Sequence, residues 1–100
     1  MNIYKLSQTI NNGYDTFDSC VVCAEDKNEA VKIHPYKFVK GFENGEWYGI
    51  YKNTNEKYIT DTPSFAWVDG SDIEKIKVEL IGKADKNIKK GIIIASFNAG

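Results

Sequence analysis

Apolar residues occur along the chain in short runs that Asn, Asp and Gly separate. The runs at 3–9 and 17–24 predict two strands, and the polar segment 11–15 between them predicts a loop. Both faces of the second run are apolar. Val21 and Cys23 lie on one face, and Cys20, Val22 and Ala24 lie on the other. This pattern is typical of a central strand that is covered on both sides.

The next segment predicts a short helix. Asp26 and Glu29 have the spacing of a capping box, in which the first residue caps the helix and the second lies in its first turn. We expect the helix to end near His34, because Pro35 pushes the residue before it out of the helical region. Ala30, Ile33 and His34 share one helical face and should pack on the sheet.

The middle of the chain is rich in aromatic residues, with nine of the 13 between positions 36 and 67. Asn44-Gly45 between apolar runs is a strong hairpin signal and predicts strands at 37–43 and 46–52, followed by a weaker strand at 57–60. We interpret 36–64 as an inserted β-meander. Its aromatic rings are equally consistent with a core and with a binding surface.

The last third predicts further strands. Thr62-Pro63-Ser64 breaks the chain, a short strand is expected at 65–68, and 69–72 reads as a turn. Positions 76–80 alternate, so one face of that strand should be buried. Positions 92–97 are continuous and β-branched, which favours a central strand.

These elements predict one α+β domain spanning 1–100. One short helix would pack on a mostly antiparallel sheet, with the aromatic-rich meander inserted between the helix and the last strands. A chain of 100 residues can bury one modest core without disulfides or metals.

The charge composition and the hydrophobic runs narrow the possible classes of function. The net charge is −1, all 13 basic residues are Lys, and the chain has no Arg. Because Arg supplies the planar fork that reads guanine and phosphate, this composition argues against a nucleic-acid reader. No apolar run approaches the ~20 residues of a membrane span, and residues 1–5 lack a signal-peptide core. We therefore expect a cytoplasmic protein without membrane partners, whose thiols are reduced.

Two motifs could carry chemistry. Cys20 and Cys23 match C-x-x-C, but in a strand they point to opposite faces, so we predict two buried structural thiols. His34 is the only histidine and could act as a general base; a packing or capping role at the helix end fits it better. We predict no metal site, no cofactor and no catalytic residue.

Several polar and aromatic residues are candidates for ligand or partner binding. Residues 14–19 form either a ligand-orienting patch or ordinary turn chemistry. Trp47 and Tyr48 should face opposite sides of a strand. Lysines near the C-terminus could face phosphate, although a solvated surface explains them better. The complete candidate set is Tyr14, Asp15, Ser19, His34, Trp47, Tyr48 and Trp67.

Four segments resemble a group of small phage and prophage proteins: Tyr14 to Ala24, Ile33-His34-Pro35, Trp67, and Ala95 to Gly100. The resemblance covers the first and last thirds of the chain. It implies a counter-defence context, in which some proteins sequester cyclic nucleotide signals and others block a host nuclease.

We therefore expect a non-enzymatic, homo-oligomeric binding protein in the host cytoplasm that sequesters a nucleotide immune signal. One alternative is an inhibitor that binds a host defence protein, such as a CRISPR nuclease, directly. Another is a small nucleotide hydrolase that uses His34 with Asp15 or Asp18. A nucleic-acid binder that uses the C-terminal lysines is the least favoured.

Overall fold

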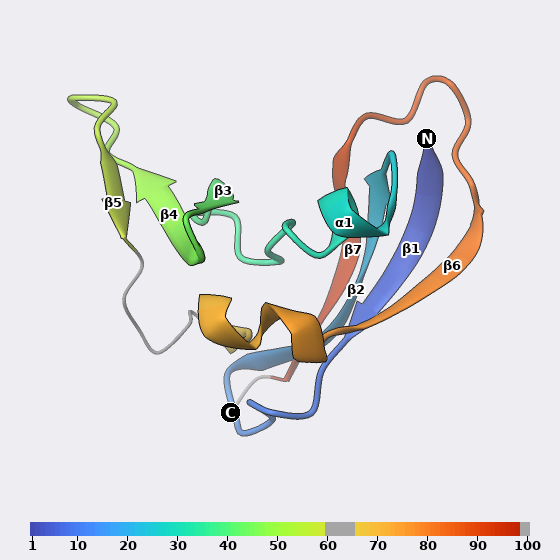
Figure 1. The fold of residues 1–100 in the computed structure, drawn as a ribbon, viewed down its shortest axis with the longest axis horizontal. Coiled ribbons are helices and arrows are strands. Elements are labelled where there is room, and N and C mark those ends of the chain that lie inside the picture. The colour runs from blue at the N-terminus through green and yellow to red at the C-terminus, as the bar shows by residue number, and fades with distance from the viewer. Residues whose placement is uncertain (60–65, 99–100) are drawn as a thin grey trace.

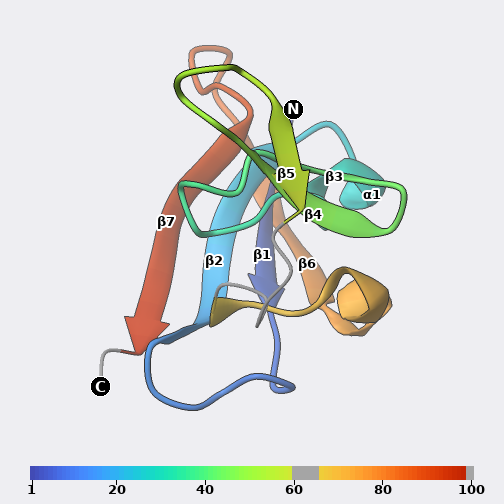
Figure 2. The ribbon, with the colours of Figure 1, turned by 90° about the vertical axis from the view of Figure 1, so that its left-hand side faces the viewer.

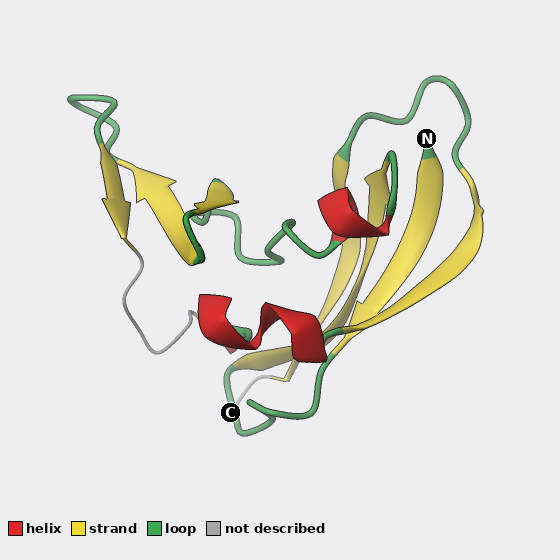
Figure 3. Cartoon of the chain, viewed as in Figure 1, coloured by secondary structure: helices red, strands yellow, loops and turns green. Residues whose placement is uncertain are grey.

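The computed structural model describes residues 1–59 and 66–98, which form two antiparallel sheets and short helices (Figures 1 and 3). The larger sheet has the order β6-β1-β2-β7. Its strands are β1 (Asn2–Ser7), β2 (Thr16–Ala24), β6 (Lys77–Lys83) and β7 (Gly91–Asn98). The smaller sheet has the order β3-β4-β5, with β3 (Gly41–Glu43), β4 (Glu46–Ile50) and β5 (Lys57–Ile59). The helices are α1 (Lys27–Ala30) and the 3-10 helix η2 (Gly70–Lys75).

The predicted cap is confirmed, but the predicted helix is much shorter than expected. Asp26 Oδ1 accepts a hydrogen bond from the Glu29 amide at 2.8 Å. After Ala30, however, the amides of Lys32 and Ile33 donate to carbonyls three residues back, so the last turn tightens and α1 ends. Pro35 is too close for another helical turn to form.

The predicted hairpin is confirmed at its turn. Asn44 and Gly45 both have positive φ, 54° and 80°, which the right-handed twist of the flanking strands requires of a two-residue turn. The strands are shorter than predicted, since residues 37–40 form a turn and a link without regular secondary structure before β3 begins. Three parts of the predictions lie outside the described residues. They are the expected strand end at Thr60, the rest of the insertion to Ser64, and the expected strand start at Phe65.

Three expectations for the last third are wrong. Ala66 to Val68 is not a strand, because Ala66 adopts a positive φ of 66°. The strand expected to be central, β7, lies at an edge of the larger sheet, next to β2 (Figure 2). A continuous apolar run indicates that a strand can be buried, but strand order depends on pairing between distant segments. The alternation predicted for 76–80 also fails, since Leu80 is exposed.

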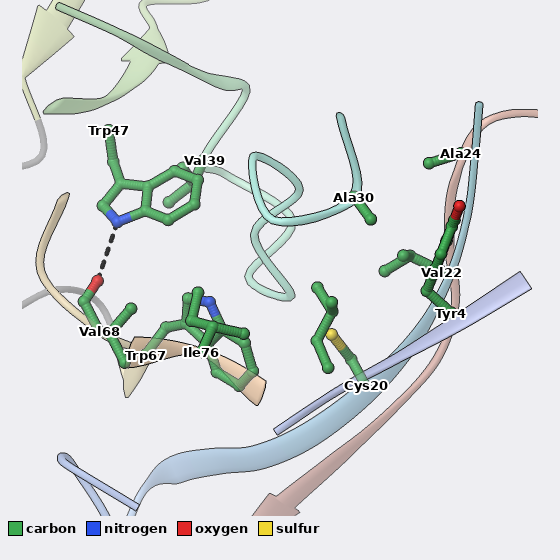
Figure 4. Packing of buried hydrophobic residues seen from close by; sticks show 11 residues of the cluster. Tyr4, Cys20, Val22, Ala24, Ala30, Val39, Trp47, Trp67, Val68 and Ile76 are labelled. Carbon is green, nitrogen blue, oxygen red and sulfur yellow. Dashed lines mark hydrogen bonds between the residues drawn. The ribbon is translucent and has the colours of Figure 1, made fainter. Parts of the chain in front are cut away.

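The core lies on the inner face of the larger sheet, under α1 and the smaller sheet (Figure 4). Cross-strand partners share a face, and Leu6 lies opposite Cys20 while Tyr4 lies opposite Val22. The cluster comprises Tyr4, Leu6, Cys20, Val22, Ala24, Ala30, Val39, Trp47, Trp67, Val68 and Ile76. Burying each large side chain stabilises the fold by about 1.5–3 kcal/mol, so this cluster is what holds the two sheets together.

The described chain is thus a small domain of antiparallel sheets with few short helices, and it is mostly β because α1 has only four residues. β2 is central as predicted. Its inner face is buried, whereas Val21 on its outer face is only partly covered. Within the described residues, no helix is long and apolar enough to cross a membrane.

Candidate functional site

Three of the sequence-predicted binding residues meet inside the core rather than at a surface. The ring of His34 packs edge-on against Trp47, with centroids 4.9 Å apart, and lies 6.4 Å from Trp67. The indole N–H of Trp47 donates to the Val68 carbonyl at 2.8 Å (Figure 4). His34 is 6% exposed, and its Nδ1 accepts a hydrogen bond from the Tyr36 amide. These contacts give the three residues a packing role.

Tyr48 faces away from Trp47, as the alternation of a strand requires. Its ring lies so close to Gly41 on the neighbouring strand that a Cβ there would overlap it. Lys57 lies over the Tyr48 ring, with Nζ 4.6 Å from the centroid, and forms an ion pair with Glu43. The side-chain hydrogen bond with Glu43 raises the pKa of Lys57. Tyr48 is therefore a half-buried member of a cross-strand cluster whose charged residues, Glu43 and Lys57, are exposed.

The polar candidates Tyr14, Asp15 and Ser19 lie elsewhere, around the start of β2. Tyr14 is 78% exposed. The amide of Asp15, at positive φ, donates to the Asn98 carbonyl at 2.6 Å and so joins the loop to the end of β7. Ser19 lies opposite Ser7 of β1 and Ser96 of β7. None of the three belongs to the core cluster that contains Trp47 and Trp67.

A basic cleft of about 580 Å³ lies between the segment after α1 and the start of β7. Figure 2 shows that segment beside β7, at one edge of the sheet. The cleft is lined by Lys32, Ile33, His34, Pro35, Tyr36, Lys37, Val39, Lys40, Lys90, Gly91 and Ile92. Four lysines thus surround one cleft in a protein whose net charge is −1. Such a local concentration of positive charge attracts anions.

An apolar pocket of about 340 Å³ adjoins the basic cleft, because Pro35, Tyr36 and Lys37 line both. Its remaining walls are Phe17 and Phe97, whose rings are 4.8 Å apart. We call the basic cleft and this apolar pocket together the β7 groove. One end of the β7 groove offers ammonium groups, and the other offers aromatic rings.

The lysines of the β7 groove are mostly turned toward solvent. Lys90 is 3.7 Å from the Glu29 carboxylate, and its side chain is 58% exposed. Lys40 Nζ donates to the Lys37 carbonyl at 3.3 Å. These are weak, solvent-screened contacts, so an incoming anion can replace them at little cost.

The cysteines do not form a reactive site. Both are buried and free, as predicted, and they point to opposite faces of β2. Burial raises the pKa of the Cys20 thiol to about 12, so the thiol stays protonated near neutral pH. Within residues 1–59 and 66–98, no group of three or more His, Cys, Asp and Glu side chains is arranged to hold a metal ion.

Sequence reasoning missed most of the β7 groove. Lys32, Lys37 and Lys40 follow the predicted helix at close spacing around Pro35, and that spacing was the available signal. Phe17 and Phe97 are 80 positions apart, and only the pairing of β2 with β7 places them together.

Comparison of the chain with protein-family models, curated proteins and solved structures finds no match.

Proposed function

We propose that this protein is a non-enzymatic binding protein that sequesters a small nucleotide in the β7 groove. The observation that carries the proposal is the union of four lysines with an aromatic pocket in one groove. In keeping with the phage-like segments, we propose that the nucleotide is a host immune signal. The protein would then be a counter-defence factor of the host cytoplasm, acting as a homo-oligomer.

The basic end of the groove suits phosphate. Lysine side chains are flexible point charges that contact phosphate oxygens through charge-assisted hydrogen bonds. Lys32, Lys37 and Lys40 come from one segment, and Lys90 approaches from the start of β7. Because these ammonium groups converge from two sides, they favour a compact anion whose phosphate can offer several oxygens to several lysines at once.

The aromatic end suits a nucleobase. Tyr36, Phe17 and Phe97 present rings in a pocket whose surface is mostly apolar. Stacking of a base on an aromatic ring contributes about 1–3 kcal/mol. A nucleotide that spans the groove would place its base here and its phosphate among the lysines.

The contacts of His34 support binding rather than hydrolysis. A general base must reach a proton of the substrate or its water with a ring nitrogen. His34 Nδ1 instead accepts the Tyr36 amide proton, and the ring is held against Trp47. We therefore expect a bound nucleotide to be released unchanged.

The test is a thermal-shift and calorimetric screen of the protein against linear and cyclic mono- and dinucleotides. A ligand at a hundredfold excess over its dissociation constant stabilises the native state by about 2.7 kcal/mol. For a domain of this size, that corresponds to a rise in Tm on the order of 10 °C. Chromatography of the released ligand should show no turnover.

The double variant K32E/K40E should weaken binding of the identified nucleotide by about tenfold or more, because each change replaces attraction to phosphate with repulsion. The matched control is K52E/K86E, which has the same charge change at two exposed lysines that line neither part of the β7 groove. Equal affinities of the two double variants, or no binding of any nucleotide by the wild type, would overturn the proposal.

A second candidate function is direct inhibition of a host defence protein through the aromatic insertion, which we place at 36–64. The observation that favours it is the apolar surface of the β4–β5 hairpin. Tyr51 is 54% exposed and packs on Tyr58 with centroids 4.5 Å apart, and Ile59 is 49% exposed. Exposed tyrosines are common anchors of protein interfaces. Retention of a defence protein by the wild type but not by Y51E would support this function.

A further inference from the structure

β7 is an edge strand with few of the features that usually prevent pairing with another chain. Its eight residues contain no charged side chain and no proline. Ile92, Ile93, Ile94 and Phe97 are all exposed, and Ile94 is 64% exposed. In an antiparallel sheet, half of the backbone N–H and C=O groups of such a strand point away from its partner. Exposed apolar side chains therefore flank a row of backbone groups that another strand can bind.

The opposite edge of the same sheet is protected. β6 has Lys77, Glu79 and Lys83 within seven residues, and a register shift against β1 at Ile81 bends it. Charged residues and bulges are the usual means by which edge strands avoid pairing. The β2–β7 pairing has two irregularities, and only the one at Ile93 inserts an extra residue into β7, since the other inserts Asp18 into β2. The segment from Ile94 to Asn98 therefore contains no bulge of its own.

We propose that β7 pairs with β7 of a second copy of this chain, so that two four-stranded sheets join into one continuous sheet. The occupant is a second copy because the two ends of the edge carry opposite charges. Lys89 and Lys90 lie immediately before β7, whereas Asp15 lies at its far end, where its amide bonds to Asn98. Asp18 is exposed on the adjacent strand near that same end.

This charge distribution selects an antiparallel arrangement about a two-fold axis. In that arrangement, Lys89 and Lys90 of one copy lie at the acidic end of its partner. Two strand spacings, or ~10 Å, separate the β7 strand of one copy from the β2 strand of the other, which carries Asp18. The lysines of the two copies are then separated by the length of β7, about 27 Å at 3.4 Å per residue. A parallel arrangement would place the four lysines together. Two-fold pairing is also closed, so it yields a dimer rather than a fibre.

The pairing specifies a surface for the homo-oligomer, and it does not depend on which ligand the β7 groove takes. A two-fold axis normal to the sheet keeps the inner faces of both copies on the same side. Both grooves then open on one face of the dimer.

Sedimentation equilibrium of the full chain tests the proposal. The wild type should have twice the monomer mass at micromolar concentration. I94K should raise the dimer dissociation constant by about a hundredfold or more, because symmetry places two lysines at an interface that excludes water. The matched control is I81K, an identical change at an isoleucine that is 54% exposed on the β6 edge, and it should remain dimeric.

A wild type that stays monomeric at millimolar concentration would overturn the proposal, as would an I94K variant as dimeric as I81K. Cross-linking with a short bismaleimide gives a second readout that does not rely on a disruptive variant. S96C on the exposed face of β7 should cross-link between copies, and I81C should not. The native thiols are buried and should not compete. Cross-linking through I81C alone would place the contact at the other edge and contradict the proposal.

Discussion

At the scale of single residues, two buried tryptophans differ in how their indole N–H groups are satisfied. The Trp47 N–H donates to the Val68 carbonyl. The Trp67 side chain is fully buried, and its N–H has no hydrogen-bond partner within the described residues. An unpaired buried donor costs free energy, because it gives up water without replacement. Both rings belong to one core cluster, so their surroundings are comparable.

Trp47→Phe and Trp67→Phe should therefore lower the free energy of unfolding by different amounts, although both remove a similar ring volume. Trp47→Phe also leaves the Val68 carbonyl without its indole donor, so it should lower the free energy of unfolding by about 1–3 kcal/mol more than Trp67→Phe. Urea denaturation followed by far-UV circular dichroism measures both values. Equal losses would show that the Trp47 hydrogen bond adds nothing to packing.

At the scale of elements, residues close together in the sequence determine the β3–β4 hairpin and the start of α1. The Asn44-Gly45 turn needs two residues at positive φ. Gly70, at the start of η2, packs so closely on the Gly45 carbonyl that it has no room for a Cβ. The turn therefore contacts η2 as well as joining β3 to β4.

Gly45→Ala should lower the free energy of unfolding by about 1–2 kcal/mol, because a Cβ is unfavourable in the left-handed region. Its Cβ would meet open space, so the loss would report backbone conformation alone. The matched control is Gly13→Ala, where a Cβ also meets open space and φ is not positive. That change should be neutral or stabilising by about 0.4–1 kcal/mol, because it restricts the unfolded chain. Similar effects at both positions would contradict the assignment of Asn44-Gly45 to a type I′ turn, in which both central residues have positive φ.

At the scale of the whole molecule, the two sheets share one core. Leu6 and Val22 of the larger sheet belong to the same buried cluster as Trp47 of β4 and Val39 before β3. His34 and Val68 contact the Trp47 ring from two other segments. Separating the sheets would expose this cluster to water, so neither sheet should be stable without the other.

The chain should consequently unfold in a single cooperative transition. Tryptophan fluorescence reports the junction of the two sheets, whereas far-UV circular dichroism reports strands throughout the chain. In urea the two transitions should coincide, with a slope of about 1–3 kcal/mol per M. A fluorescence change that precedes the loss of circular dichroism would show that the smaller sheet unfolds separately.

The sequence by itself determined the features that depend on near neighbours. Alternation and β-branching located β1, β2 and β7, Asp26 marked the start of α1, and Asn44-Gly45 fixed a hairpin. Each depends on side-chain periodicity or on the φ of one or two residues, which a short segment sets alone.

Only the tertiary structure decided which segments meet. It put β7 at an edge, buried His34 with Trp47 and Trp67, and joined the lysines after α1 to Lys90 in one groove. Those outcomes depend on contacts between residues far apart in the chain, and no local periodicity encodes which apolar run pairs with which. The candidate residues chosen from sequence were therefore mostly core or turn residues. Phe17 and Phe97 of the β7 groove meet only through the pairing of β2 with β7, and Lys90 joins the lysines that follow α1 only in the tertiary structure.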